Sequence, residues 1–217
     1  MTPGPRRVGL VTVSATYGAG GSRIADALAR RLGVPLLDRA ISVAVAERLA
    51  IPLDEALAAE DSVSSVGSRL IAGLAAAVVA WGAPADAGTL DEATFREEIE
   101  LALADLTAAG AGVVLGRAGA VVLSDDERAL HVRLDGPVER RIAAAMSRAR
   151  IDRETAARQL ERTDRARTAY VQHLYGVDPR DPRLYHLIID STALSLETCV
   201  DLIATAVRDR EAPPGRT

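Results

Sequence analysis

Short runs of mostly apolar residues recur along the chain, and segments with helical spacing lie between them. Several runs are apolar at nearly every position, which is typical of strands buried on both faces of a parallel sheet. We predict five strands: Val8–Ser14, Pro35–Asp38, Val113–Arg117, Leu130–Leu134 and His186–Asp190. Because strands and helical segments alternate, the pattern favours an α/β fold, a doubly wound parallel sheet with right-handed crossovers.

Apolar residues three or four positions apart predict the helices. In the first helix, Ile24, Leu28 and Leu32 share one face, and Gly33 stands where a C-terminal cap belongs. The predicted helices are Ser22–Leu32, Thr94–Ala109, Val138–Met146 and Leu196–Val207.

The spacing of the strands also predicts the domain organisation. About 75 residues, 39–112, separate the second strand from the third, far more than a crossover helix needs. We interpret them as a helical insert within a single domain of residues 8–210, with flexible ends at 1–7 and 211–217. The apolar segment Leu70–Trp81 fits a homodimer face as well as the core of the insert.

Composition excludes several classes of protein. With 48% hydrophobic residues the chain can bury a core, and a lone Cys199 cannot form a disulfide scaffold. All 26 basic residues are arginine, so chemistry that needs a lysine is excluded. The net charge of −4 gives no basic field for nucleic acid, and no apolar run reaches the roughly 20 residues that cross a bilayer. We therefore expect a cytoplasmic protein with neither a nucleic-acid nor a membrane partner.

A glycine-rich loop joins the first strand to the first helix. Backbone N–H groups at such a junction form a ready phosphate site. The P-loop pattern GxxxxGK[ST] fits from position 15, with Ala15 in place of the first glycine and Gly21 in place of the lysine. We predict a degenerate P-loop in which the hydroxyl of Ser22 faces Mg²⁺. Its predicted nucleotide-binding residues are Gly18, Ala19, Gly20, Gly21, Ser22 and Arg23.

Other readings of this loop stay open. It could be a tight turn without a ligand. A dinucleotide fingerprint GxGxxG would use Gly18 and Gly20, with Asp38 as the ribose-binding acid, but Arg23 stands at its third glycine. The loop is also long for a dinucleotide turn.

Arginine is concentrated between residues 139 and 167, a segment with nine arginines and five acidic residues. Arg158, Arg162 and Arg165 have the i, i+4, i+7 spacing of one helix side. We predict an arginine-rich lid that faces the glycine loop. The planar guanidinium group of arginine can form two parallel hydrogen bonds to a phosphate group. Arginine can therefore supply the positive charge that the missing lysine does not.

Six segments in order make the chain similar to the cytidylate kinase-like family, a divergent branch of the P-loop nucleoside monophosphate kinases. The matching segments are Ser14–Ser22, Val34–Arg39, Val113–Arg117, Leu130–Leu134, Glu161–Arg167 and Tyr185–Thr192. The resemblance implies an adenylate-kinase-like P-loop NTPase fold with five parallel strands, a nucleotide-monophosphate-binding insert and the lid at 139–167. It also implies transfer of the γ-phosphoryl group of ATP, with Mg²⁺, to a nucleoside monophosphate such as CMP or dCMP. The alternative is a non-catalytic protein that binds or senses nucleotides.

The resemblance assigns site residues by position. The catalytic candidates are Arg162, Asp164, Arg165 and Arg167. The acceptor-binding candidates are Asp38, Arg39 and Arg117. Two departures, Ala118 and Ala166, replace acids of the family pattern. Losing an acid that reads the base removes hydrogen bonds that discriminate between acceptors.

Overall fold

A computed structural model of the 217-residue chain describes residues 9–38, 108, 110–116 and 118–210. Five parallel strands form one sheet in the order β2-β3-β1-β4-β5. The strands are β1 (Leu10–Ala15), β2 (Leu36–Asp38), β3 (Gly112–Leu115), β4 (Ala129–Asp135) and β5 (Leu187–Asp190). All five predicted strands are confirmed, with ends that differ by one or two residues.

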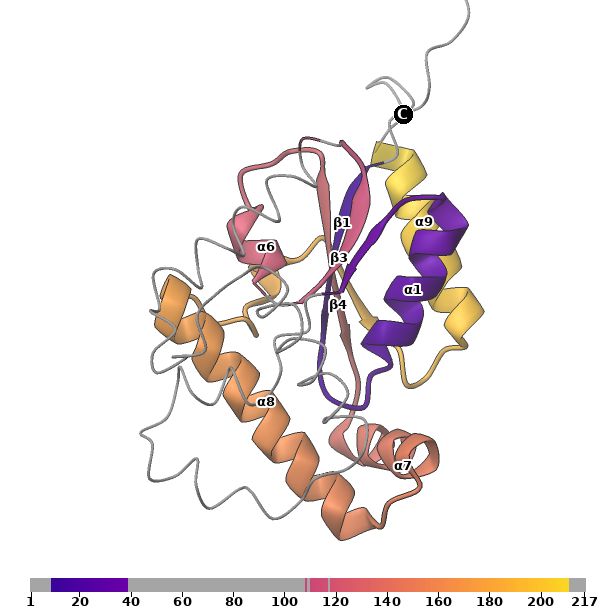
Figure 1. Cartoon of the computed structure of the whole chain (residues 1–217), viewed down its shortest axis with the longest axis vertical. Helices are drawn as coiled ribbons and strands as arrows, with labels where there is room; N and C mark the ends of the chain where they lie inside the picture. The colour runs from indigo at the N-terminus through magenta and orange to yellow at the C-terminus, as the bar shows by residue number, and fades with distance from the viewer. Residues whose placement is uncertain (1–8, 39–107, 109, 117, 211–217) are drawn as a thin grey trace, which may run out of the picture.

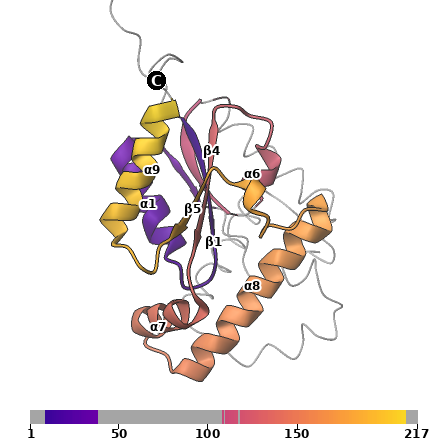
Figure 2. The ribbon, with the colours of Figure 1, turned by 180° about the vertical axis from the view of Figure 1, so that it is seen from behind.

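Helices cover both faces of the sheet (Figure 1, Figure 2). On one face lie α1 (Gly21–Leu32) and α9 (Leu196–Arg210); on the other lie the short α6 (Gly119–Val122) and the upper part of α8 (Arg153–Tyr175). A 3-10 helix, η2 (Pro182–Leu184), precedes β5. Gly33 caps α1 at φ 68°, as the sequence predicted. The predicted insert, 39–112, lies almost wholly outside the described residues, as do the two chain ends and nearly all of the predicted helix Thr94–Ala109.

Burial explains the strand order. Every residue of β1 is buried, because helices pack on both of its faces and strands pair with both of its edges. Alternate β1 residues such as Val11 and Val13 face α1 and α9 in the main core. Leu10 contributes instead to a second core that includes Val171 of α8.

The lower part of the molecule is a helical hairpin at the carboxyl ends of the strands (Figure 1). Helix α7 (Val138–Ala149) follows β4 directly and packs on the first half of α8 through Ile142, Ala145, Ala156 and Leu160. This small core is separate from the two cores on the sheet, and Tyr17 of the glycine loop packs against it. The predicted lid segment is thus the α7–α8 hairpin, held against the glycine loop.

Candidate functional site

The glycine loop occupies residues 16–20, between the end of β1 and the start of α1. Gly18 (φ 83°) and Gly20 (φ 77°) both adopt the left-handed conformation. Gly20 is the N-cap of α1, where no side chain caps the helix. φ is thus positive at Gly18 and Gly20 and negative at Ala19 between them, an alternation typical of backbone segments whose N–H groups bind anions.

Several N–H groups of the loop remain available to a ligand. Those of Thr16, Tyr17 and Ala19 donate to Leu134 O, Asp164 Oδ1 and Thr16 O. Within the described part of the chain, four others donate no hydrogen bond: those of Gly18, Gly20, Gly21 and Ser22. They lie at the positive end of the α1 dipole, so an anionic group at this point would be stabilised by both the N–H groups and the dipole.

Residues at the carboxyl ends of β4 and β5 form hydrogen bonds with the loop. Thr16 donates from its hydroxyl to Asp135 Oδ1 at 2.9 Å, and Ser191 donates from its hydroxyl to Ala19 O at 2.7 Å. Burial opposes the ionisation of Asp135, but hydrogen bonds from Arg133, Gly136 N–H and Thr16 outweigh it and lower the pKa of this carboxyl. Asp135 is therefore an ionised anchor for the loop.

The α7–α8 hairpin also forms hydrogen bonds with the loop. Asp164 of α8 accepts hydrogen bonds from Tyr17 N–H (2.9 Å) and from Arg141 Nη1 (2.6 Å). Arg141, on α7, is buried and also donates to Tyr17 O (3.2 Å) and Gly136 O (2.9 Å). Burial raises the pKa of Tyr17, so its hydroxyl stays protonated and donates to Gln159 Oε1.

Two further arginines reach the loop from the hairpin. Arg167 donates from Nη1 to Ala15 O at 3.3 Å. Arg148, in the last turn of α7, donates from Nη2 to Gly18 O at 2.9 Å. Partial burial and the neighbouring charge of Arg23 lower the pKa of Arg148.

The structure brings some of the predicted catalytic residues to the loop and leaves others on the outer surface. Asp164 and Arg167 contact the loop, whereas Arg162 and Arg165 are exposed. Arg165 pairs with Glu161 one turn earlier, and Arg158 pairs in the same way with Glu154. The expectation that this row faces the loop is wrong for Arg158 and Arg165. The buried stripe of α8 includes Leu160 and Thr163, which are offset from the row around the helix.

The predicted nucleotide-binding and acceptor-binding residues differ in their exposure, and two of them lie outside the described residues. Ser22 and Arg23 are exposed on the first turn of α1, while Ala19 is buried in the main core. Asp38 ends β2 and pairs in register with Leu115 of β3, so the ends of these two strands lie together. Arg39 and Arg117 lie outside the described residues.

Sequence reasoning missed four residues that build the site: Asp135, Arg141, Arg148 and Ser191. Ser191 lies close before the last helix but does not cap it, because Ser195 is the N-cap and accepts from Thr198 N–H at 3.0 Å. A signal for the arginines was present, because Arg141 and Arg148 are seven residues apart and share one side of a helix. The strand-end position of Asp135, beside β1, was the signal for the anchor.

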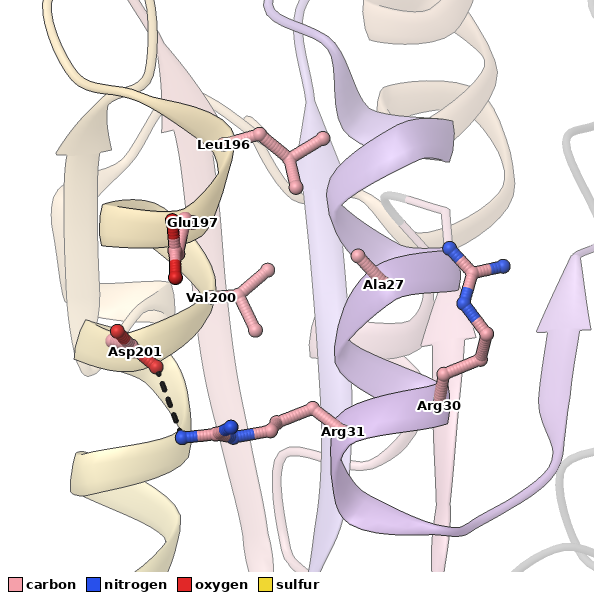
Figure 3. A pocket seen from close by; sticks show the side chains of 7 residues that line it. All are labelled: Ala27, Arg30, Arg31, Leu196, Glu197, Val200 and Asp201. Atoms are coloured by element: carbon pink, nitrogen blue, oxygen red, sulfur yellow. Dashed lines mark hydrogen bonds and ion pairs between the residues drawn. The ribbon is translucent and has the colours of Figure 1, made fainter.

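A separate hollow lies between α1 and α9 (Figure 3). Leu196, Val200 and Ala27 form its apolar floor, and the Arg31–Asp201 ion pair crosses one end. None of the predicted site residues lines it. The phosphate-binding geometry and this hollow are therefore different places on the molecule.

The donors available for Mg²⁺ near the loop are few. Among the described residues, no three acidic, histidine or cysteine side chains gather to hold a metal ion. The carboxylates of Asp135 and Asp164 are occupied by arginines. The Ser22 hydroxyl forms no hydrogen bond within the described part of the chain. Mg²⁺ in nucleotide sites keeps several waters and binds phosphate oxygens, so one hydroxyl ligand fits it.

A five-stranded parallel sheet with this strand order, a glycine loop after the central strand and an arginine-bearing hairpin over it define a P-loop kinase-like α/β fold. The sequence matches the model of the Cytidylate kinase-like family over residues 10–193, and the chain belongs to that family. No helix in the described ranges combines the length and apolar character needed to cross a membrane.

Individual relatives are more distant. A cytidylate kinase of Methanopyrus kandleri is 30% identical over 95 residues, covering 42% of this chain and 49% of that protein. A uronate isomerase of Corynebacterium glutamicum is 33% identical over 92 residues, covering 42% of this chain and 18% of the isomerase. The chain thus spans about half or less of the curated relatives it matches. An uncharacterized protein from Eubacterium ventriosum shares the fold, with a TM-score of 0.64 at 17% identity over 93% of this chain and 99% of that one.

Proposed function

We propose that this protein is a nucleoside monophosphate kinase that transfers the γ-phosphoryl group of ATP, with Mg²⁺, to an acceptor such as CMP or dCMP. The observation that carries the proposal is a group of four loop N–H groups beside the start of α1 that donate no hydrogen bond to any described residue, in a chain of the cytidylate kinase-like family. A phosphate chain bound to these N–H groups would gain several charge-assisted hydrogen bonds.

In this proposal the loop residues bind the donor nucleotide, and Asp164 positions the loop. The N–H groups of Gly18, Gly20, Gly21 and Ser22 would bind the donor phosphates, and the Ser22 hydroxyl would hold Mg²⁺. Bound there, the ion would neutralise charge on the donor phosphates. Asp164 acts as a positioning residue, because both of its oxygens are used to hold the loop and Arg141.

The acceptor would bind over the carboxyl ends of β2 and β3, where Asp38 stands. Arg39 and Arg117 would contact its phosphate, as the family resemblance implies. An oxygen of the acceptor phosphate would form the new bond to the γ-phosphorus while the bond to the bridging oxygen breaks. ADP would leave with the electron pair, so no proton transfer is required. Arg167, whose guanidinium reaches the loop, is proposed to offset charge on the transferred group.

Base selectivity should be low. Ala118, where the family pattern has an acid, is buried and offers the base no acceptor. Hydrogen bonds of that type carry most of the discrimination between substrates. We therefore expect CMP, dCMP and UMP to be phosphorylated with similar efficiency.

A second candidate is a non-catalytic nucleotide-binding or sensing protein, because position 21 carries glycine where a P-loop carries lysine. A coupled assay with ATP, Mg²⁺ and each of CMP, dCMP, UMP and AMP separates the two. Turnover of at least one acceptor supports the kinase. Binding of MgATP in calorimetry, with no turnover of any acceptor, would favour the sensor.

A further inference from the structure

The absence of a lysine at position 21 has a steric cause. A Cβ atom built on Gly21 would lie 2.5 Å from the Cβ of Ala15, well inside van der Waals contact. The methyl group of Ala15 therefore fills the space that a side chain at position 21 needs. Ala15 itself stands where the P-loop pattern has its first glycine, so the two departures from that pattern are a matched exchange.

Another cation lies over the same loop. The Arg148 guanidinium donates to Gly18 O at 2.9 Å and lies 3.5–3.8 Å from where a Cβ of residue 20 would be. It thus lies against Gly18 and Gly20, two of the residues whose N–H groups donate no hydrogen bond within the described part of the chain. Arg148 is largely exposed, so an incoming anion can reach it.

The charges around Arg148 are unbalanced. Within the described part of the chain, neither Arg148 nor Arg23 forms an ion pair with a carboxylate. The two positive charges oppose each other, and partial burial adds to the cost of keeping Arg148 charged. By contrast, Arg141 is neutralised by Asp164. An anion in the loop would relieve the repulsion between Arg148 and Arg23.

We propose that Arg148 performs the task of the P-loop lysine: its guanidinium exchanges the Gly18 carbonyl for the terminal phosphate oxygens of the bound nucleotide. The inference rests on the proposed function for the identity of the ligand. The exchange replaces a neutral acceptor by a charged one, which gives a stronger hydrogen bond. Because Arg148 belongs to α7, the bound nucleotide would then bridge the hairpin and the loop in place of this direct bond.

Calorimetry with MgATP and with magnesium tripolyphosphate tests this role without depending on turnover. Arg148→Ala should weaken binding of both ligands by about ten- to a hundredfold, the equivalent of one charge-assisted hydrogen bond. Arg153→Ala is the matched control, because Arg153 lies on the same hairpin, pairs with Glu139 and has no contact with the loop. It should change binding less than about twofold.

A rescue experiment uses the matched exchange at positions 15 and 21. Adding Ala15→Gly and Gly21→Lys together removes the methyl group and restores a lysine in its usual place. In the Arg148→Ala background, this pair should recover at least about tenfold of the lost affinity for MgATP. Gly21→Lys alone should not, because the methyl group of Ala15 remains.

The outcomes separate this inference from the proposed function. Equal affinities of Arg148→Ala, Arg153→Ala and wild type for both ligands would overturn the role of Arg148, even with kinase turnover intact. A selective loss in Arg148→Ala supports the role even where no acceptor is phosphorylated. Failure of wild type to bind either ligand would overturn both. If the triple variant does not fold, the two single variants still decide.

Discussion

Asp164 and Tyr17 join the arginine-bearing hairpin to the glycine loop: the carboxylate of Asp164 accepts from the backbone N–H of Tyr17 at 2.9 Å. The other oxygen of the same carboxylate holds Arg141, whose side chain is only 8% exposed. The loop conformation therefore depends on a charge pair between α8, which carries Asp164, and α7, which carries Arg141. A change to this pair should affect folding and nucleotide binding together.

Asp164→Asn tests that dependence. The amide keeps the shape of the side chain but removes the nearer charge partner of the buried Arg141, which keeps only Asp135, 3.8 Å from its Nε. We expect a loss of roughly 2–4 kcal/mol in the free energy of unfolding. Urea denaturation, with MgATP binding measured in parallel, checks the result.

Glu161→Gln is the control on the same helix. It breaks the Glu161–Arg165 pair, in which both side chains are more than 70% exposed. Such a surface pair contributes at most about 1 kcal/mol. Equal losses in the two variants would mean that Asp164 does not pair with Arg141 in solution.

Gly18→Ala should push α7 away from the loop and so lower the free energy of unfolding. An added methyl group would overlap the carbonyl oxygen of Arg141, and φ of 83° is itself unfavourable for alanine. Gly176→Ala, at φ 66° with no atom within 4 Å, carries the conformational cost alone, about 1–2 kcal/mol. Thermal and urea unfolding should show Gly18→Ala to be worse by roughly 1–3 kcal/mol. Matching stabilities would show that α7 does not lie against Gly18.

Two serines near the end of the sheet should behave differently. Ser191→Ala removes the bond that holds Ala19 O, and Ser195→Ala removes the N-cap of α9. Each should cost about 1 kcal/mol of stability. Only Ser191→Ala should also weaken MgATP binding, because only Ser191 contacts the loop. Equal effects of both variants on calorimetric affinity would argue against an anchoring role.

The sequence predicted the sheet better than the site. Apolar runs such as Val113–Leu115 mark buried strands directly, since a parallel strand that is buried on both faces is mostly apolar. The glycine loop was also predicted, because left-handed φ at Gly18 and Gly20 needs glycine. The contacts made by Arg141 and Arg148 depend on how α7 docks below the sheet, which local spacing does not encode. The predicted arginine row followed helical spacing correctly but could not show which side of α8 is buried.

The pH dependence of stability should come from the far end of the sheet. His131 is 5% exposed on β4, close to the Thr12 hydroxyl (Oγ1 to Nδ1, 2.8 Å) and stacked on His186. Burial, with the adjacent His186, lowers the pKa of His131 to about 4. In the unfolded chain a histidine binds its proton near pH 6.5. The unfolded state therefore binds more protons between these values, and stability should fall as the pH falls from 6.5 to 4.

One such proton gives a slope no steeper than about 1.4 kcal/mol per pH unit. Urea unfolding at several pH values should show this slope in wild type and a flatter one in His131→Asn, which keeps a hydrogen-bonding group near Thr12 but does not titrate. His173→Asn, on an exposed part of α8, controls for the removal of a histidine. The readout is the slope, so a lower overall stability of His131→Asn does not disturb the comparison. An unchanged slope in that variant would mean that another group that titrates in this range causes the acid sensitivity, His186 first, because burial lowers its pKa too.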